Sequence, residues 1–113
     1  MSNINWFKEF PAAITVCNSE GVILEMNDKS IQTFQNDGGK ELIGKNLFDC
    51  HPEPSKSAVK ELLKKQKKNC YTIEKNRKKK LIYQSPWYEN GKYKGLVELS
   101  LEIPVEMPHH IRE

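Results

Sequence analysis

Two neighbouring side chains, Cys50 and His51, are the residues of this chain best suited to metal or redox chemistry. Imidazole and thiolate are both good ligands of transition metals, and an exposed thiolate reacts with oxidants. Four roles stay open for the pair: ligation of haem or another metal, redox sensing, polar recognition of an organic ligand, and a histidine hydrogen-bonded to backbone in a turn. Adjacent residues rarely both reach one metal, and no second Cys or His pair is spaced for a zinc set, so we favour the turn.

The segment around this pair, residues 44–68, is expected to form a rigid turn followed by a helix. Pro52 and Pro54 prevent a helix from continuing through them, because proline lacks an N–H and restrains the residue before it. Ser55 stands where an N-cap residue is expected, and Val59 and Leu62 belong to an apolar stripe at helical spacing. The turn therefore presents the Cys–His pair next to the start of a one-sided helix.

Five further segments have the composition of β-strands. β-Branched, aromatic and other apolar residues gather in them, and loops that contain Gly or Asn separate several of them. The strands are expected at residues 12–17, 22–26, 70–75, 81–88 and 93–103, with short helices within residues 28–43. Runs of strands broken by one helical block predict an α+β fold, an antiparallel sheet with helices packed on one face.

Side chains of the expected helix and strands would line the interior between them. Aromatic walls with a few polar groups are typical of a small-molecule pocket and equally of a filled core, and both alternatives stay open. The expected lining residues are Val59, Leu62, Tyr71, Ile73, Tyr83, Ser85 and Trp87. Glu98 shares a strand face with Leu96 and Ser100, and this face would meet a polar ligand, solvent or a second subunit. Val97 and Leu99, on the alternate face, are expected to point into the core.

Composition limits the class of protein. The 113 residues suit one domain, and no apolar run approaches the length of about 20 residues that a membrane helix needs. The start of the chain does not resemble a signal peptide, and three widely spaced cysteines favour reduced thiols in the cytoplasm. Cys17 and Cys70 fall in strands and are expected to pack as small apolar groups. No catalytic triad, paired acid–base carboxylates or phosphate loop can be assembled, so no enzyme is expected.

Charge and the N-terminal stripe suggest the kind of partner. Nine of the basic residues fall within residues 64–80, but no aromatic residue lies among the bases of residues 75–80, so nucleic acid is not expected. Ile4, Phe7 and Phe10 stand at helical spacing before Pro11. We expect this stripe to pack on its own sheet or to form a dimer contact, and we predict a homodimer.

Three stretches together resemble a PAS domain, a small sensor fold of two strands, a helical crossover and a three-stranded meander. The middle stretch, with its Cys-His-Pro segment, is similar to a subgroup of bacterial PAS sensors. The stretches are FPAAITVCNSEGVILEMND, LIGKNLFDCHPEPS and YENGKYKGLVELSLEIP. The resemblance implies a five-stranded antiparallel sheet with a helical crossover packed on one face. It divides the chain into N-terminal turns (1–10), a PAS domain (11–104) and a C-terminal tail (105–113).

The resemblance also implies a function. It indicates a sensor or adaptor in signal transduction that binds a small apolar or aromatic molecule, or a protein partner, without catalysis. Where most PAS domains end in Asp-Ile-Thr before an effector, this chain has Glu102-Ile103-Pro104, so we expect an effector protein in trans. The alternatives are a haem- or redox-linked sensor that uses His51 and Cys50, and a pure dimerisation module with a packed core.

Overall fold

A single antiparallel sheet of five strands organises the molecule. This computed structural model describes residues 4–50 and 52–113. The strands are β1 (Ala13–Asn18), β2 (Ile23–Met26), β3 (Asn69–Lys75), β4 (Lys78–Glu89) and β5 (Lys92–Ile103). They lie in the order β2-β1-β5-β4-β3, and every neighbouring pair is antiparallel. The predicted α+β fold, five antiparallel strands with a helical crossover, is confirmed.

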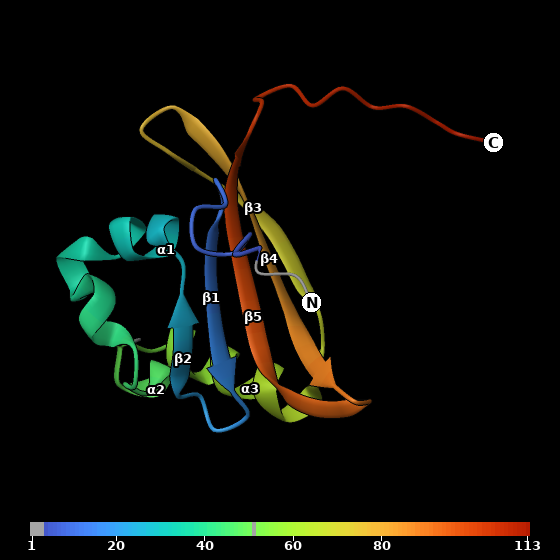
Figure 1. Cartoon of the computed structure of the whole chain (residues 1–113). Coiled ribbons are helices and arrows are strands. Elements are labelled where there is room, and N and C mark those ends of the chain that lie inside the picture. The colour runs from blue at the N-terminus through green and yellow to red at the C-terminus, as the bar shows by residue number, and fades with distance from the viewer. Residues whose placement is uncertain (1–3, 51) are drawn as a thin grey trace.

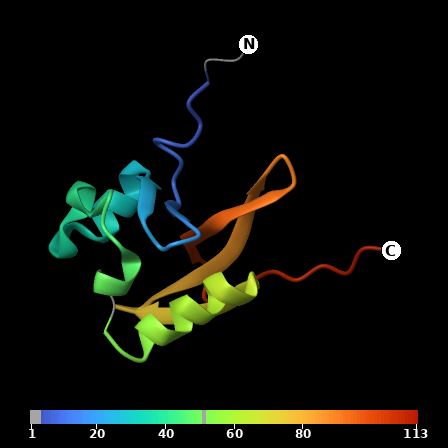
Figure 2. The same ribbon diagram turned by 90° about the horizontal axis from the view of Figure 1, so that it is seen from below.

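The helices of the crossover between β2 and β3 cover one face of this sheet (Figures 1 and 2). They are α1 (Asp28–Thr33), the 3-10 helices η1 (Gln35–Asp37) and η2 (Gly39–Leu42), α2 (Leu47–Cys50) and α3 (Ser55–Lys65). We call the face that they cover the inner face of the sheet and the opposite face the outer face.

Two small apolar clusters lie between the layers. Towards α3, Cys17 and Leu96 of the sheet pack with Val59 and Leu63 of the helix. Towards the 3-10 helices, Ile23 and Met26 pack with Leu42, and the half-buried Leu47 contacts both clusters. The core is therefore divided into two parts, one under each half of the crossover.

The alternation of side chains along β5 is the reverse of the one expected. Leu96 packs against α3 on the inner face, and Glu98 lies on the same side of the strand. Because successive residues of a strand point to opposite faces, Val97 and Leu99 lie on the outer face rather than in the core. The expectation was wrong because both faces of β5 carry apolar residues, so hydrophobicity alone does not distinguish them.

The start of α3 also differs in detail from expectation. Pro54, not Ser55, holds the N-cap position of α3 and makes no side-chain cap bond. The carboxylate of Glu53 takes over this role, accepting hydrogen bonds from the Ser57 amide at 2.9 Å and from the Ser57 hydroxyl at 2.7 Å. A carboxylate near a helix N-terminus satisfies its free N–H groups and its positive end charge, which explains why the helix begins here.

The two chain ends leave the sheet in different ways. Residues 6–9 form a turn, and Figure 2 shows this N-terminal segment on the side of the sheet opposite α3. Trp6 packs edge-on against Phe7 and Phe10, with ring centroids 5.9 Å apart in each pair. Beyond Ile103 the chain extends away from the sheet without further strand or helix (Figure 1). Within residues 4–50 and 52–113, no helix is both long and apolar enough to cross a bilayer.

Candidate functional site: a cavity on the inner face

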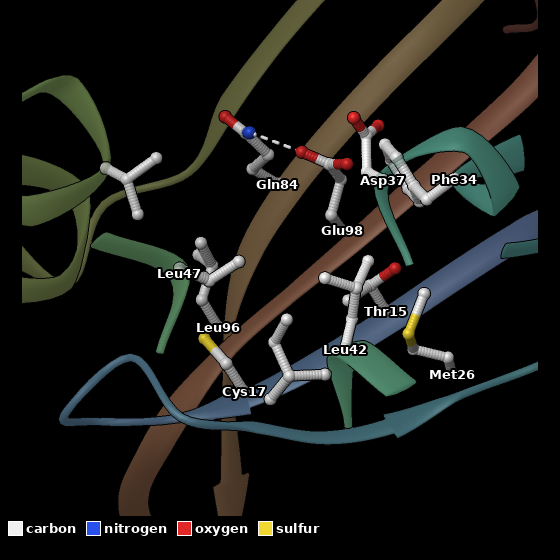
Figure 3. Close-up of a pocket in the computed structure, with 12 residues that line it drawn as sticks. Thr15, Cys17, Met26, Phe34, Asp37, Leu42, Leu47, Gln84, Leu96 and Glu98 are labelled. Atoms are coloured by element: carbon white, nitrogen blue, oxygen red, sulfur yellow. Dashed lines mark hydrogen bonds between the residues drawn. The ribbon is translucent and has the colours of Figure 1, made fainter. Parts of the chain in front are cut away.

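A cavity of about 160 Å³ lies between the sheet and the crossover helices. Figure 3 shows its walls: the strands supply one side, and residues of the helical segments close the other. The twelve lining residues are Thr15, Cys17, Ile23, Met26, Phe34, Asp37, Leu42, Leu47, Val59, Gln84, Leu96 and Glu98. Residues of both apolar clusters line the cavity, so it is a part of the interior that the core side chains leave open.

A row of polar side chains crosses the inner face of the sheet at this cavity. Strand register places Asn69, Gln84, Glu98 and Thr15 side by side on four neighbouring strands. Asn69 Nδ2 donates to Gln84 Oε1 at 2.9 Å, and Gln84 Nε2 donates to Glu98 Oε2 at 2.7 Å. The Thr15 hydroxyl shares a hydrogen bond of 2.5 Å with that of Ser30 in α1. Side-chain hydrogen bonds therefore hold the polar part of the cavity wall in place.

The negative charge of the Glu98 carboxylate affects the pKa values of two neighbouring side chains. Burial raises the pKa of the Cys17 thiol above its usual value, and the negative charge of Glu98 raises it further. Partial desolvation also raises the pKa of the Tyr71 hydroxyl on β3, again with a contribution from Glu98. Both groups are therefore neutral at physiological pH, and the charge of the sheet wall is carried by the carboxylate.

Two of the residues predicted as ligand contacts, Val59 and Glu98, line the cavity. Leu62 is half-buried on α3 without reaching the cavity wall. Tyr71 shares the inner face with Ile82, its partner on β4, and Ile73 follows two residues later, but both are exposed on the edge strand β3. Both side chains therefore lie on the inner face but outside the cavity.

Tyr83, Ser85 and Trp87 do not lie in the interior where they were expected. They alternate with Gln84, which lines the cavity, and so point to the outer face. Trp87 crosses β5 on that side, and its indole Nε1 donates to the Cys17 carbonyl at 2.9 Å. The error has the same origin as that on β5, since aromatic residues suggested the buried face but occupy the outer one.

The Cys50–His51 hypothesis is not tested by this structure. His51 lies outside the described residues, and nothing is described for the Cys50 side chain. Among the residues whose side chains are described, no group of three or more His, Cys, Asp or Glu side chains could hold a metal ion. Of the other two cysteines, Cys17 packs in the core as predicted, whereas Cys70 is exposed on β3, contrary to prediction.

Sequence reasoning missed most of the polar cavity wall. Gln84 was assigned to the wrong face, and Thr15 and Asp37 were not considered. No local signal was available in β1, because Thr15 and Cys17 line the cavity while the more apolar Ile14 and Val16 alternate with them. Placing Thr15 beside Gln84 and Glu98 requires the strand register, which depends on pairing across the whole sheet.

Comparison with known proteins identifies the fold family. Residues 11–86 match the family model described as PAS domain. The chain belongs to the PAS domain family. PAS domains are generally sensory modules rather than catalysts, and they occur in histidine kinases and receptors. No curated protein matches the chain.

Solved structures agree with this family. A C-terminal domain from Streptococcus mutans is 20% identical, with a TM-score of 0.68 over 85% of this chain and 78% of that one. The PAS domain of Bordetella pertussis BvgS is 17% identical, with a TM-score of 0.66 over 87% and 81% of the two chains. The PAS domain of the histidine kinase ThkA is 20% identical, with a TM-score of 0.63 over 79% and 96%. At these identities the likeness establishes the fold alone.

Proposed function

We propose that this PAS domain is a sensor in signal transduction that binds a small molecule in the inner cavity and performs no catalysis. The observation that carries the proposal is the cavity itself, because a domain of this size with a filled core would have no such space. Its volume of about 160 Å³ is close to that of cavities of about 150 Å³ that bind benzene. The expected ligand is therefore small, with a buried part about the size of one aromatic ring.

The position of the cavity supports a signalling role. Its walls come from β1, β2, β4 and β5 on one side and from η1, η2, α2 and α3 on the other. A molecule bound there contacts both layers at once, so binding stabilises the arrangement in which they are held together. The crossover helices are the elements that a ligand would move or rigidify relative to the sheet.

We further propose that the signal leaves through protein contacts on the outer face, with a second copy of the chain as the first partner. The outer face carries apolar side chains that are only half-buried, among them Val97, Leu99 and Leu101. The N-terminal aromatic group lies on the same side, and Trp6 and Phe10 are 62% and 46% exposed. Exposed apolar patches of this kind are typical of protein interfaces. An effector protein in trans would bind the resulting dimer and transmit the signal.

A thermal-shift screen against small metabolites tests the sensor role. A ligand at about 100 times its Kd stabilises the folded state by about 2.7 kcal/mol, which raises the melting temperature of a domain of this size by roughly 10 °C or more. We expect at least one small, partly apolar compound to do so. Its effect should be lost in Val59→Phe, which fills the cavity, and retained in Val97→Phe, which makes the same change on the outer face.

The opposite result is equally clear. If no metabolite stabilises the wild-type protein, or if Val59→Phe is stabilised as strongly as the wild type, the cavity is not a ligand site. The domain would then be better described as a dimerisation module. Val59→Leu, a smaller change at the same position, serves where the phenylalanine variant unfolds.

A further inference from the structure

We propose that the inner cavity recognises an organic cation: a primary amine or a similar protonated base attached to an apolar body about the size of one ring. This inference rests on the proposed sensor function and specifies the chemical class of its ligand. It follows from the amphipathic shape of the cavity, which the charges and hydrogen bonds of its wall define.

The cavity has a polar end and an apolar end. Figure 3 shows Gln84, Glu98 and Asp37 at one end, and Leu96, Cys17 and Leu42 towards the other. Two of the twelve lining residues are charged, and both are carboxylates. No lysine, arginine or histidine is among these lining residues, so no protein cation within the described wall neutralises them.

Glu98 is held ready for a donor from the ligand. Gln84, which is 6% exposed, accepts from Asn69 through its amide oxygen, so its NH₂ group faces Glu98. The NH₂ group donates a hydrogen bond to Glu98 Oε2, while Oε1 has no hydrogen-bond partner among the residues that the structure describes. The Asn69–Gln84 pair thus fixes the carboxylate in one orientation and leaves one oxygen available to the cavity.

The charge of the carboxylate selects the ligand class. A hydrogen bond to a charged group is roughly twice as strong as one between neutral groups. A protonated amine forms such a hydrogen bond with Glu98, and this bond replaces the hydrogen bonds from the water that ligand binding expels. A neutral ligand of the same shape covers Glu98 without compensating its charge, and an anion is repelled by both Glu98 and Asp37. The apolar end accepts the ring or alkyl body of the ligand.

Three matched probes test the charge preference by titration calorimetry of the full chain at pH 7: phenethylamine, 2-phenylethanol and phenylacetate. The amine and the alcohol have the same ring and spacer and differ in charge. We expect phenethylamine to bind about tenfold or more tighter than 2-phenylethanol, the factor that about 1.4 kcal/mol provides. Phenylacetate should bind least.

Glu98→Gln removes the charge with little change of shape. It should weaken phenethylamine binding by about tenfold and leave 2-phenylethanol within about threefold of its wild-type affinity. Asp37→Asn, at the exposed rim of the cavity, should weaken the amine by a smaller factor. Glu102→Gln is the matched control, because Glu102 is an exposed carboxylate of the same strand outside the cavity wall, paired with Lys78 at 3.5 Å. It should leave amine binding unchanged.

The outcomes separate this inference from the sensor function. If 2-phenylethanol or phenylacetate binds as tightly as the amine, or if Glu98→Gln leaves amine affinity unchanged, the cation preference is overturned while the cavity remains a ligand site. If none of the three probes binds, the inference is also overturned, and the metabolite screen with the Val59→Phe variant decides the sensor function. Should Glu98→Gln fail to fold, Asp37→Asn and the three wild-type titrations still decide the preference.

Discussion

At the scale of single residues, Asn27 shows how one side chain joins three parts of the domain. It is 1% exposed, and its Oδ1 accepts from the amides of Ile14 at 2.9 Å and Ser30 at 3.0 Å. Its Nδ2 donates to the carbonyls of Ala12 at 2.7 Å and Phe10 at 3.3 Å. The amide therefore caps α1, supports β1 and anchors the N-terminal segment at the same time. Every polar atom of this buried side chain has a partner, as buried polar groups require.

Removing this amide should destabilise the domain strongly. We expect Asn27→Ala to lower the free energy of unfolding by about 2–4 kcal/mol, because it removes a helix cap and leaves buried backbone groups unpaired. Asn27→Asp should cost a comparable amount, since a carboxylate cannot donate to the Ala12 carbonyl. Urea denaturation measures both. Asn36→Ala, at an exposed position of η1, is the control, and an effect of Asn27→Ala as small as that of the control would contradict this role.

Cys17 and Cys70 should differ sharply in reactivity. Burial and the nearby charge of Glu98 raise the pKa of the Cys17 thiol, so it stays protonated and shielded at neutral pH, whereas Cys70 is exposed. In a Cys50→Ser background, one thiol should react with Ellman's reagent in the folded protein and two after unfolding. Rapid reaction of both thiols in the folded state would show that the interior near Glu98 is open to the reagent.

The same raised pKa has a consequence for stability at high pH. The unfolded chain ionises Cys17 near the usual cysteine pKa of about 8.5, while the folded protein keeps the proton. The contribution of this group is fully present below that pH and is lost as the pH rises through the folded-state pKa.

At the scale of elements, the start of α3 depends on the ionised state of Glu53. Hydrogen bonds from the side chain and backbone of Ser57 lower the pKa of the Glu53 carboxyl. Its contribution is therefore present above the usual glutamate pKa of about 4.3 and is lost as the pH falls through the lower folded-state value.

We expect Glu53→Gln to lower the melting temperature slightly at pH 7, with a difference from the wild type that shrinks as the pH falls below 4. Thermal unfolding followed by circular dichroism at several pH values measures this. Glu41→Gln, at an exposed position of η2, provides the comparison. A Glu53→Gln effect that is constant from pH 3 to pH 7 would mean that the charge of Glu53 does not stabilise the helix.

The strands show what sequence alone could and could not predict. All five were expected within a few residues of their observed bounds, because turns and apolar runs are local signals. The faces of β4 and β5 were reversed, because Tyr83, Trp87, Val97 and Leu99 make the outer face as apolar as the inner one. Gln84 looked like a surface residue by type, and for the face that carries Glu98 the sequence left a polar ligand, solvent and a second subunit as alternatives. The interior position of both residues depends on the register across four strands, which no local pattern specifies.

At the scale of the whole molecule, the two faces of the sheet differ from the usual pattern: polar side chains line the covered inner face, and apolar side chains lie on the outer face. The solvent-facing side of an antiparallel sheet usually carries polar residues. Here it carries Val97, Leu99 and Leu101, which are only half-buried. The misassigned faces and the proposed dimer thus have one origin. A sheet that is apolar on both sides packs helices on one and, we propose, a second copy of the chain on the other.

The homodimer can be tested by light scattering. We expect a mass of twice the 13.1 kDa of the chain, and a shift towards the monomer when residues 1–10 are removed or when Leu99→Glu places a charge on the outer face. Ile73→Glu, at an exposed apolar position on the edge strand, should leave the mass unchanged. A monomeric wild type, or a dimer that neither outer-face change weakens, would contradict the proposed contact.

The proposed sensor function requires that a ligand binds in the inner cavity, and methyl NMR tests this most directly. The strongest stabiliser from the metabolite screen is added to protein labelled at its Ile, Leu and Val methyl groups. We predict intermolecular NOEs to the inner methyl groups of Ile23, Leu42, Val59 and Leu96 and none to those of Val97, Leu99 and Leu101. NOEs confined to the outer set would place the ligand on the other side of the sheet and contradict the account.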